Sequence, residues 1–237
     1  DDVSRADRAS AVLALVGVVN LPIIRYSVEW WNSIHQAPSV MKMDRPSMPF
    51  DMLAPLLAML TRFGHVTKDA PIFIQSFEVS NLKDLNSTLL PKAGLDLKLV
   101  QLLDAYDVAD DGSLIYADVN ARPYDFAVSG DKRTYADLQT VSGLAEIAKY
   151  ADGIGPWKPM IQATKIVDAN GDGRADDLNA DGAVNGQDRV LAPPSALVSN
   201  AHAQGLFVPA YTFRDEARFL ANNYAGNPQA EFTNFIN

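Results

Sequence analysis

The sequence contains no cysteine, which excludes disulfide bonds, zinc–thiolate sites and covalent attachment of c-type haem. It also lacks a basic excess: 20 lysine and arginine residues face 29 aspartate and glutamate residues, and the formal net charge is −9. Nucleic-acid binding needs a basic footprint against the phosphates, so no nucleic-acid partner is expected. The sequence starts at Asp1 and does not begin with the basic segment that precedes the apolar core of a signal peptide. No signal peptide is therefore visible.

An uninterrupted apolar run of membrane-spanning length is missing as well. Ala9–Ile24 is nearly all apolar, but Asn20 and Pro22 interrupt it, and it falls below the ~20 residues that cross a bilayer. It fits either a buried helix of a soluble protein or the end of a longer membrane helix. A tryptophan pair follows and would suit a membrane–water interface. Membrane association through residues 9–60 is therefore one prediction.

The composition, 48% hydrophobic and 21% charged over 237 residues, is ordinary for a soluble globular protein of one large or two small domains. Residues 1–63 form a predicted apolar helical segment. In residues 64–237, apolar runs typical of buried strands alternate with short amphipathic helices. The predicted strands lie within 71–78, 95–104, 153–161 and 206–214. This alternation predicts βα units and hence a parallel sheet or barrel.

The predicted helices have recognisable starts and stops. One begins with Asn81 as its cap and ends before Pro91, and a second starts at Thr140 or Ser142. A third is closed by Gly205, and a last short helix falls within residues 214–224.

The segment Asp168–Asp188 carries six aspartates and one arginine, which amounts to −5 of the net −9. Carboxylates this close repel one another unless a cation lies among them. Two overlapping registers have calcium-loop spacing, with oxygen ligands at positions 1, 3, 5, 9 and 12 and glycine at position 6. The ligand candidates are Asp177, Asn179, Asp181, Asn185 and Asp188 in one register, and Asp168, Asn170, Asp172, Asp176 and Asn179 in the other.

Because the two registers share Asn179 and neither ends in the usual glutamate, we predict a structural loop that binds Ca²⁺ rather than a calcium sensor. The alternative is a solvated acidic loop without metal.

The stretch VGVVNLPIIRYSVEWWNSIHQ closely resembles the haem exporter protein C family of cytochrome c maturation. The resemblance covers about residues 8–60 and rests on NLPII followed by WWN and then HQ. It implies a segment that joins a membrane helix to a periplasmic loop, with His35 in the place of a haem ligand. The family's second histidine has no counterpart, so haem is not expected as a cofactor. A haem-handling fragment with His35 as ligand is kept as the alternative.

A second resemblance covers about residues 64–237. The motifs IFIQSFEVSNLK, YADLQTVSGLAEIAKYADGIGPWK and LVSNAHAQGLFVPAYTFRDEARFL are similar to the C-terminal half of periplasmic glycerophosphodiester phosphodiesterases. This resemblance implies a partial (β/α)8 barrel with its site at the loop face after the strands. It also implies hydrolysis of a small phosphodiester to glycerol 3-phosphate and an alcohol, with a divalent ion and a histidine pair.

The resemblance places several side chains on that substrate face. They are Gln75, Phe77, Glu78, Trp157, Tyr211 and Arg214. For Gln75 and Phe77 the alternative is ordinary strand packing, and for Trp157 and Tyr211 it is packing in the core or in a lid. For Arg214 the alternative is a salt bridge to Asp215 or Glu216. Asp104 either lines the same rim or caps a turn.

The catalytic histidines and metal ligands of that family have no match here. The three histidines, His35, His65 and His202, all lie outside such motifs. We therefore expect this polypeptide to be of phosphodiesterase lineage but inactive, periplasmic or secreted, and open to self-association through exposed sheet edges. A calcium-binding module without catalysis is the remaining alternative.

Overall fold

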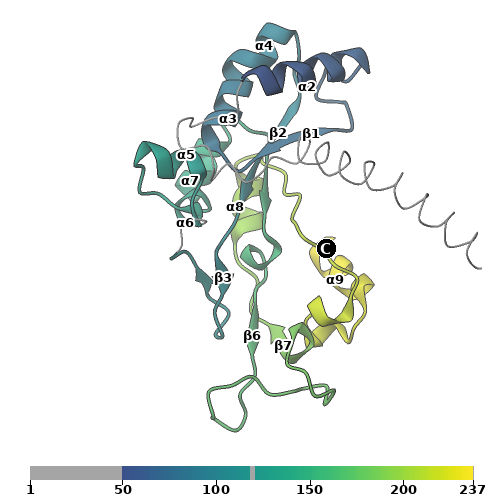
Figure 1. Ribbon diagram of the computed structural model, residues 1–237. Helices are drawn as coiled ribbons and strands as arrows, with labels where there is room; N and C mark the ends of the chain where they lie inside the picture. The colour runs from purple at the N-terminus through teal and green to yellow at the C-terminus, as the bar shows by residue number, and fades with distance from the viewer. Residues whose placement is uncertain (1–49, 118–120, 237) are drawn as a thin grey trace, which may run out of the picture. The chain divides into compact units, whose positions relative to one another are not determined.

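The computed structural model describes residues 50–117 and 121–236, which lie within one compact unit, Arg45–Asn237 (Figure 1). The predictions for Ala9–Ile24 and for His35 fall outside the described residues. Within the described part, no helix is both long enough and apolar enough to cross a membrane.

A parallel sheet organises the described residues. Its strands are β1 (Phe73–Ser76), β2 (Lys98–Leu103) and β5 (Gly153–Pro156), in the order β1-β2-β5. The segment 207–211 lies beside β5 and bonds to it through two isolated parallel bridges. The prediction of a mixed α/β fold with a parallel sheet is thus confirmed. The sheet formed by the described residues stays open and does not close into a barrel.

The predicted fourth strand, 206–214, is only partly formed. Bridges join Gly153 to Phe207 and Trp157 to Tyr211, without a continuous ladder between them. Pro209 lies between the two bridges and has no backbone N–H to donate, which explains the interruption.

The helix predicted from Asn81 to Pro91 differs in both boundaries. It begins earlier, as α3 (Val79–Asp84), passes through a π-helical turn at Leu85–Leu89 and ends as α4 (Leu90–Ala93). Asn81 lies inside it, buried, and its amide donates to the Glu78 carboxylate. Pro91 is the second residue of α4, directly after the π-helical turn, so the helix continues past the proline that was expected to end it.

Other elements surround the sheet. The remaining helices are α2 (Phe50–Arg62), α5 (Tyr124–Ser129), α6 (Tyr135–Leu138), α7 (Val141–Ile147), α8 (Leu197–Ala203) and α9 (Pro228–Ile236). Two short hairpins pair β3 (Asp107–Val108) with β4 (Leu114–Ile115), and β6 (Thr164–Ile166) with β7 (Arg189–Leu191). The Thr140 hydroxyl caps α7 by accepting from Gly143 N at 3.1 Å, as predicted. The last predicted helix is replaced by two 3-10 turns, Ala217–Phe219 and Asn222–Tyr224.

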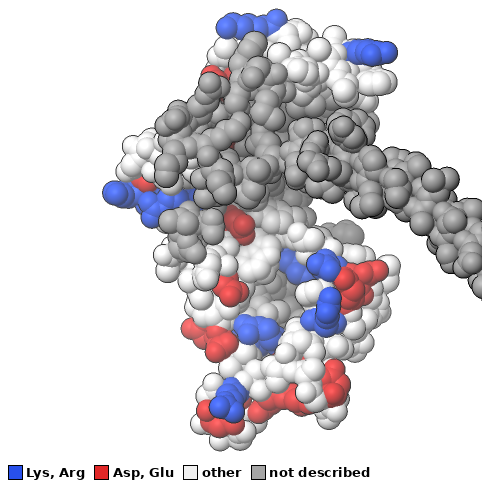
Figure 2. Space-filling model, in the orientation of Figure 1, with Lys and Arg blue, Asp and Glu red and all other residues white. Residues whose placement is uncertain are grey.

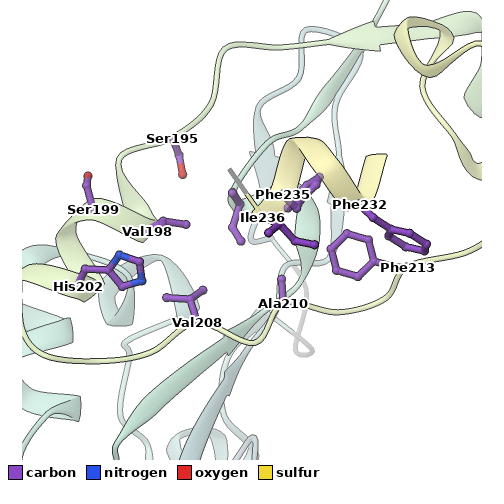
Figure 3. A pocket seen from close by; sticks show the side chains of 11 residues that line it. Ser195, Val198, Ser199, His202, Val208, Ala210, Phe213, Phe232, Phe235 and Ile236 are labelled. Atoms are coloured by element: carbon purple, nitrogen blue, oxygen red, sulfur yellow. The ribbon is translucent and has the colours of Figure 1, made fainter. Parts of the chain in front are cut away.

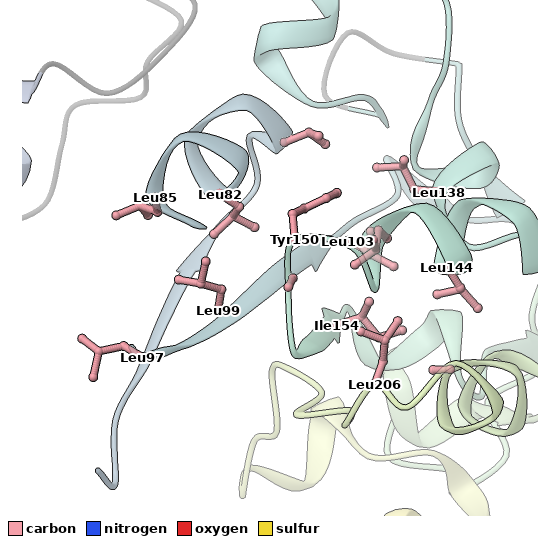
Figure 4. Close-up of a cluster of buried hydrophobic side chains, with 14 of the residues drawn as sticks. Leu82, Leu85, Leu97, Leu99, Leu103, Leu138, Leu144, Tyr150, Ile154 and Leu206 are labelled. Carbon is pink, nitrogen blue, oxygen red and sulfur yellow. The ribbon is translucent and has the colours of Figure 1, made fainter. Parts of the chain in front are cut away.

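The hydrophobic core lies between one face of the sheet and the helices that follow β1 and β2 (Figure 4). Leu99 and Leu103 of β2 and Ile154 of β5 are almost fully buried there. Leu53 and Leu57 of α2 belong to the same cluster, so α2 packs on the core that the later strands build. Burial of such side chains is the main stabilising term of the fold.

Candidate functional site at the carboxyl edge of the sheet

The carboxyl ends of the parallel strands meet at one edge, where ligands of open α/β sheets commonly bind. Leu103 pairs with Pro156, so the next residues, Asp104 and Trp157, leave their strands at the same level. Trp157 is bridged in turn to Tyr211. The register therefore brings three of the sequence-derived rim residues to one row at this edge.

Aromatic contacts tie this row to the end of β1. The Tyr211 hydroxyl donates to the carbonyl of Leu103 at 2.9 Å. Its ring lies edge-on to Phe77, with centroids 6.1 Å apart, and Phe77 makes a second edge-on contact with Tyr135 at 6.2 Å. Such edge-to-face pairs add stability beyond the area that they bury. The edge is thus a packed aromatic wall.

Asp104 is the carboxylate at the centre of this wall. Burial raises its pKa, an effect that the hydrogen bond from Ala105 N partly offsets. Burial likewise raises the pKa of Tyr135 and of Tyr211, and the negative charge of Asp104 adds to the effect on both. Burial raises the pKa of Tyr116 to about 12. At neutral pH these phenols keep their protons, and the Tyr211 hydroxyl serves as a hydrogen-bond donor.

The other predicted rim residues lie in different surroundings. Gln75 is exposed on β1, and Glu78, which immediately precedes α3, accepts from Asn81. The Arg214 guanidinium contacts Glu216, with Nε donating at 3.0 Å, and stacks over Phe219 at 4.3 Å. The salt-bridge alternative for Arg214 is therefore the observed one.

Two residues of the wall, Tyr116 and Tyr135, were not anticipated from the sequence. Tyr135 starts α6, which a capping box formed by Thr134 and Asp137 fixes locally. The Tyr116 hydroxyl accepts from the Gln139 amide at 2.9 Å. The capping box predicts a helix start, but it carries no signal that the helix will reach the edge of the sheet.

The two described histidines lie away from this edge. His65 is in the turn after α2. His202 is exposed on α8, as predicted, and lines an apolar pocket of about 680 Å³ whose other walls include Phe213 and Phe232 (Figure 3). His35 falls outside the described residues.

The acidic segment forms an exposed loop between β6 and β7, and Figure 2 shows carboxylates gathered at the end of the molecule where Figure 1 places this loop. The segment holds two similar turns nine residues apart. Asp168 Oδ2 accepts from Gly173 N at 2.9 Å, and Asp177 Oδ2 accepts from Gly182 N at 2.8 Å. Both glycines have positive φ, +80° and +84°.

The remaining ligand candidates also bond within the loop. Asn170, Asp172, Asn179 and Asp181 each accept from a backbone N–H two residues ahead, and Asp176 accepts from Ala169 N. Asp188 is fully buried and accepts from Leu178 and Asn185, while Asn185 caps the turn Gly186–Asp188. In the two described ranges, no three His, Asp or Glu side chains gather closely enough to hold a metal ion. The calcium site stays a prediction.

Comparison with known proteins shows that two parts of the chain are homologous to two different groups of proteins. Residues 1–83 match the family described as Heme exporter protein C. The protein of that name from Bradyrhizobium diazoefficiens is 57% identical over 63 residues, 27% of this chain and 24% of the relative. The N-terminal segment is therefore homologous to haem exporter protein C, as the sequence motifs predicted.

The later part is distantly homologous to glycerophosphodiester phosphodiesterases. The enzyme from Haemophilus influenzae is 31% identical over 112 residues, 47% of this chain and 28% of the relative. A homologue from Arabidopsis thaliana is 29% identical over 168 residues, 70% of this chain and 32% of the relative. The chain thus spans about a third or less of the length of these curated relatives.

Proposed function

We propose that residues 64–237 represent part of a glycerophosphodiester phosphodiesterase barrel, and that the carboxyl edge supplies one wall of its phosphodiester pocket. The row of Asp104, Trp157 and Tyr211 at the ends of adjacent parallel strands carries this proposal. Active sites of barrels built from βα units lie at this end of the strands. The distant homology to glycerophosphodiester phosphodiesterases supports a phosphodiester as the substrate class of this pocket.

Among the described residues, the same wall carries the Asp104 carboxylate but not the histidine pair that the resemblance implies for proton transfer. Its phenols have raised pKa values, and neither His65 nor His202 is placed beside it among the described residues. General acid–base catalysis is most efficient when the pKa of the catalytic group lies near the operating pH. We therefore propose that these 237 residues, made alone, bind a phosphodiester weakly and do not hydrolyse it.

The direct test is an assay of the purified chain with glycerophosphocholine and Ca²⁺ or Mg²⁺, with glycerol 3-phosphate as readout. We expect no turnover above a buffer control, because each missing electrostatic or proton-transfer group costs ~10²–10³ in rate. Release of glycerol 3-phosphate at an ordinary enzymatic rate, retained through repeated purification, would refute inactivity.

A mixing experiment tests the wall itself. The chain is combined with a fragment of the Haemophilus influenzae enzyme that lacks the matched region, and activity is assayed again. Restored activity that falls in Tyr211→Phe but not in Tyr106→Phe, an exposed tyrosine, would support the assignment. Equal activity of the two variants would count against it.

We also propose that the loop 168–188 binds Ca²⁺ as a structural ion. The repeated turn, with a first-position aspartate closing on a positive-φ glycine at position 6, supports this second candidate. A ligand bound only by the folded form at 100 times its Kd adds about 2.7 kcal/mol to stability. We expect Ca²⁺ to raise the melting temperature and Asp181→Ala to abolish the shift; identical melting curves in Ca²⁺ and EDTA would exclude the site.

The homology of residues 1–83 to haem exporter protein C suggests that this part of the chain associates with a membrane. A periplasmic location of residues 64–237 stays a prediction.

A further inference from the structure

The parallel sheet of the described residues has two open edges. β1 lies at one end of the order β1-β2-β5, and the segment 207–211 is bridged to β5 at the other end, in parallel like every other pairing. Phe207 N and Tyr211 N donate to backbone carbonyls beside the two ends of β5, both at 3.1 Å. Because backbone groups alternate in direction along a strand, Val208 and Ala210 present theirs to the open side, where a further strand can pair.

An apolar groove flanks the open edge at 207–211. Val208 and Ala210 line the pocket of about 680 Å³ together with side chains of α8 and α9 (Figure 3). Ile236, at the end of α9, also lines this pocket and is 83% exposed. In sheets built from βα units, the helix that precedes a strand packs across the seam between that strand and its neighbour. A strand added beside 207–211 would therefore bring its preceding helix over this groove.

The opposite edge carries a matching apolar row on α2, the helix that precedes β1. Leu53 and Leu57 place one side of α2 against the core. Leu56 and Met59 on α2 and Phe63 directly after it follow helical spacing on another side, and all three are exposed. A contiguous apolar row of this kind marks an interaction surface. The row and the groove thus lie at opposite edges of the same sheet.

A second copy of this chain carries the complement of both edges. We propose that two copies form a homodimer about a twofold axis along the strands, with β1 of each copy beside 207–211 of the other. The apolar row of each α2 then enters the groove of its partner, and every strand stays parallel. Two such sheets supply about the eight strands whose enclosed face side chains can fill. Phe73 and Phe207, from the two edges of one copy, already meet over that face with ring centroids 5.1 Å apart. This proposal rests on the open sheet and is independent of the phosphodiesterase function.

Sedimentation equilibrium of the full chain at micromolar concentrations tests this proposal, and we expect a species of twice the chain mass of 25.8 kDa. Met59→Asp places a charge in the apolar groove twice in each dimer, so the dissociation constant of the dimer should rise about a hundredfold. Val141→Asp is the matched control, because Val141 on α7 is 55% exposed and Met59 is 57% exposed. This control should leave the dissociation constant unchanged.

Cross-linking identifies the edges that meet, and it is specific because the chain has no cysteine of its own. A mixture of Met59→Cys and Ile236→Cys is treated with a short bismaleimide, which should join the two variants to each other but neither variant to itself. The pair Val141→Cys and Ile236→Cys should not be joined. A monomer at every concentration, a dimer that Met59→Asp leaves intact, or equal cross-linking of the two pairs would overturn the proposal. Association only with the Haemophilus influenzae fragment of the mixing experiment would overturn it as well.

Discussion

The carboxyl edge of the sheet and the acidic loop 168–188 satisfy their polar groups in opposite ways. In the loop, Asp168 bonds to Gly173 and Asp177 to Gly182, partners five residues apart. At the edge, the Tyr211 hydroxyl reaches a carbonyl 108 residues away. The loop can therefore form its turns from local sequence, whereas the edge exists only once distant strands have assembled. Disturbing the two regions should have very different costs.

Gln101→Leu should have the largest effect, because it breaks a long-range connection inside the sheet. The Gln101 amide donates to the Phe77 carbonyl at 2.9 Å and accepts from the Tyr150 hydroxyl at 3.1 Å. Leucine has a similar size but leaves the buried Tyr150 hydroxyl and the Phe77 carbonyl without this partner. We expect the free energy of unfolding in urea to fall by about 3 kcal/mol.

Gln229→Leu is the matched control, since Gln229 is exposed on α9. Its effect should stay within about 0.5 kcal/mol. Equal losses in the two variants would show that the sheet does not depend on the connection through Gln101.

The sequence predicted what local pattern and burial determine. The apolar runs located β1, β2 and β5, and Thr140 was identified as a helix cap from its residue type. The glycines at position 6 of the acidic registers have the turn conformation that the spacing implied. Each of these features depends on residues close in sequence or on a simple apolar run.

The features that could not be predicted from the sequence depend on contacts between residues far apart in the chain. Gln101 interrupts the apolar run of β2, and nothing local shows that its amide bonds to the end of β1. Tyr135 reaches the edge only because the whole excursion after β2 folds back onto it. Helix α9, which lines the apolar pocket together with α8, had no prediction at all. The candidate site was therefore predicted as a set of strand ends but not as a group of phenols around one carboxylate.

Tyr211→Phe should have an intermediate effect, because it removes one hydrogen bond at the edge while keeping the ring against Phe77. A loss of about 1 kcal/mol is expected at pH 7. Burial raises the pKa of Tyr211, so above the ordinary tyrosine pKa of ~10 the unfolded chain releases this proton while the folded chain keeps it. Stability then falls as pH rises above that value.

Phenylalanine has no such proton, so the advantage of the wild type over Tyr211→Phe should shrink between pH 8 and pH 11 on urea unfolding curves. Tyr106→Phe, at a 54% exposed position, should show neither the loss nor the trend. A gap between wild type and Tyr211→Phe that stays constant or widens with pH would mean that the phenol is not protected by the fold.

Asp172→Asn should have the smallest effect on stability, because the polar groups of the loop form their hydrogen bonds within the loop itself. Asp172 Oδ1 accepts from Arg174 N at 2.9 Å, and asparagine keeps an oxygen in that place. The change removes one of six aspartate charges from a segment of net −5. Without Ca²⁺ it should therefore raise the free energy of unfolding slightly, by no more than about 0.5 kcal/mol.

Asp111→Asn is the control that separates the effect of charge from the effect of turn geometry. Asp111 lies outside the acidic segment and accepts the same kind of hydrogen bond, from Ser113 N at 2.9 Å. Only Asp172→Asn should gain stability, and the gain should vanish at ~1 M salt, where charges are screened beyond ~3 Å. A gain that survives high salt, or one that Asp111→Asn shares, would show that repulsion among the loop carboxylates is not what distinguishes this region from the sheet.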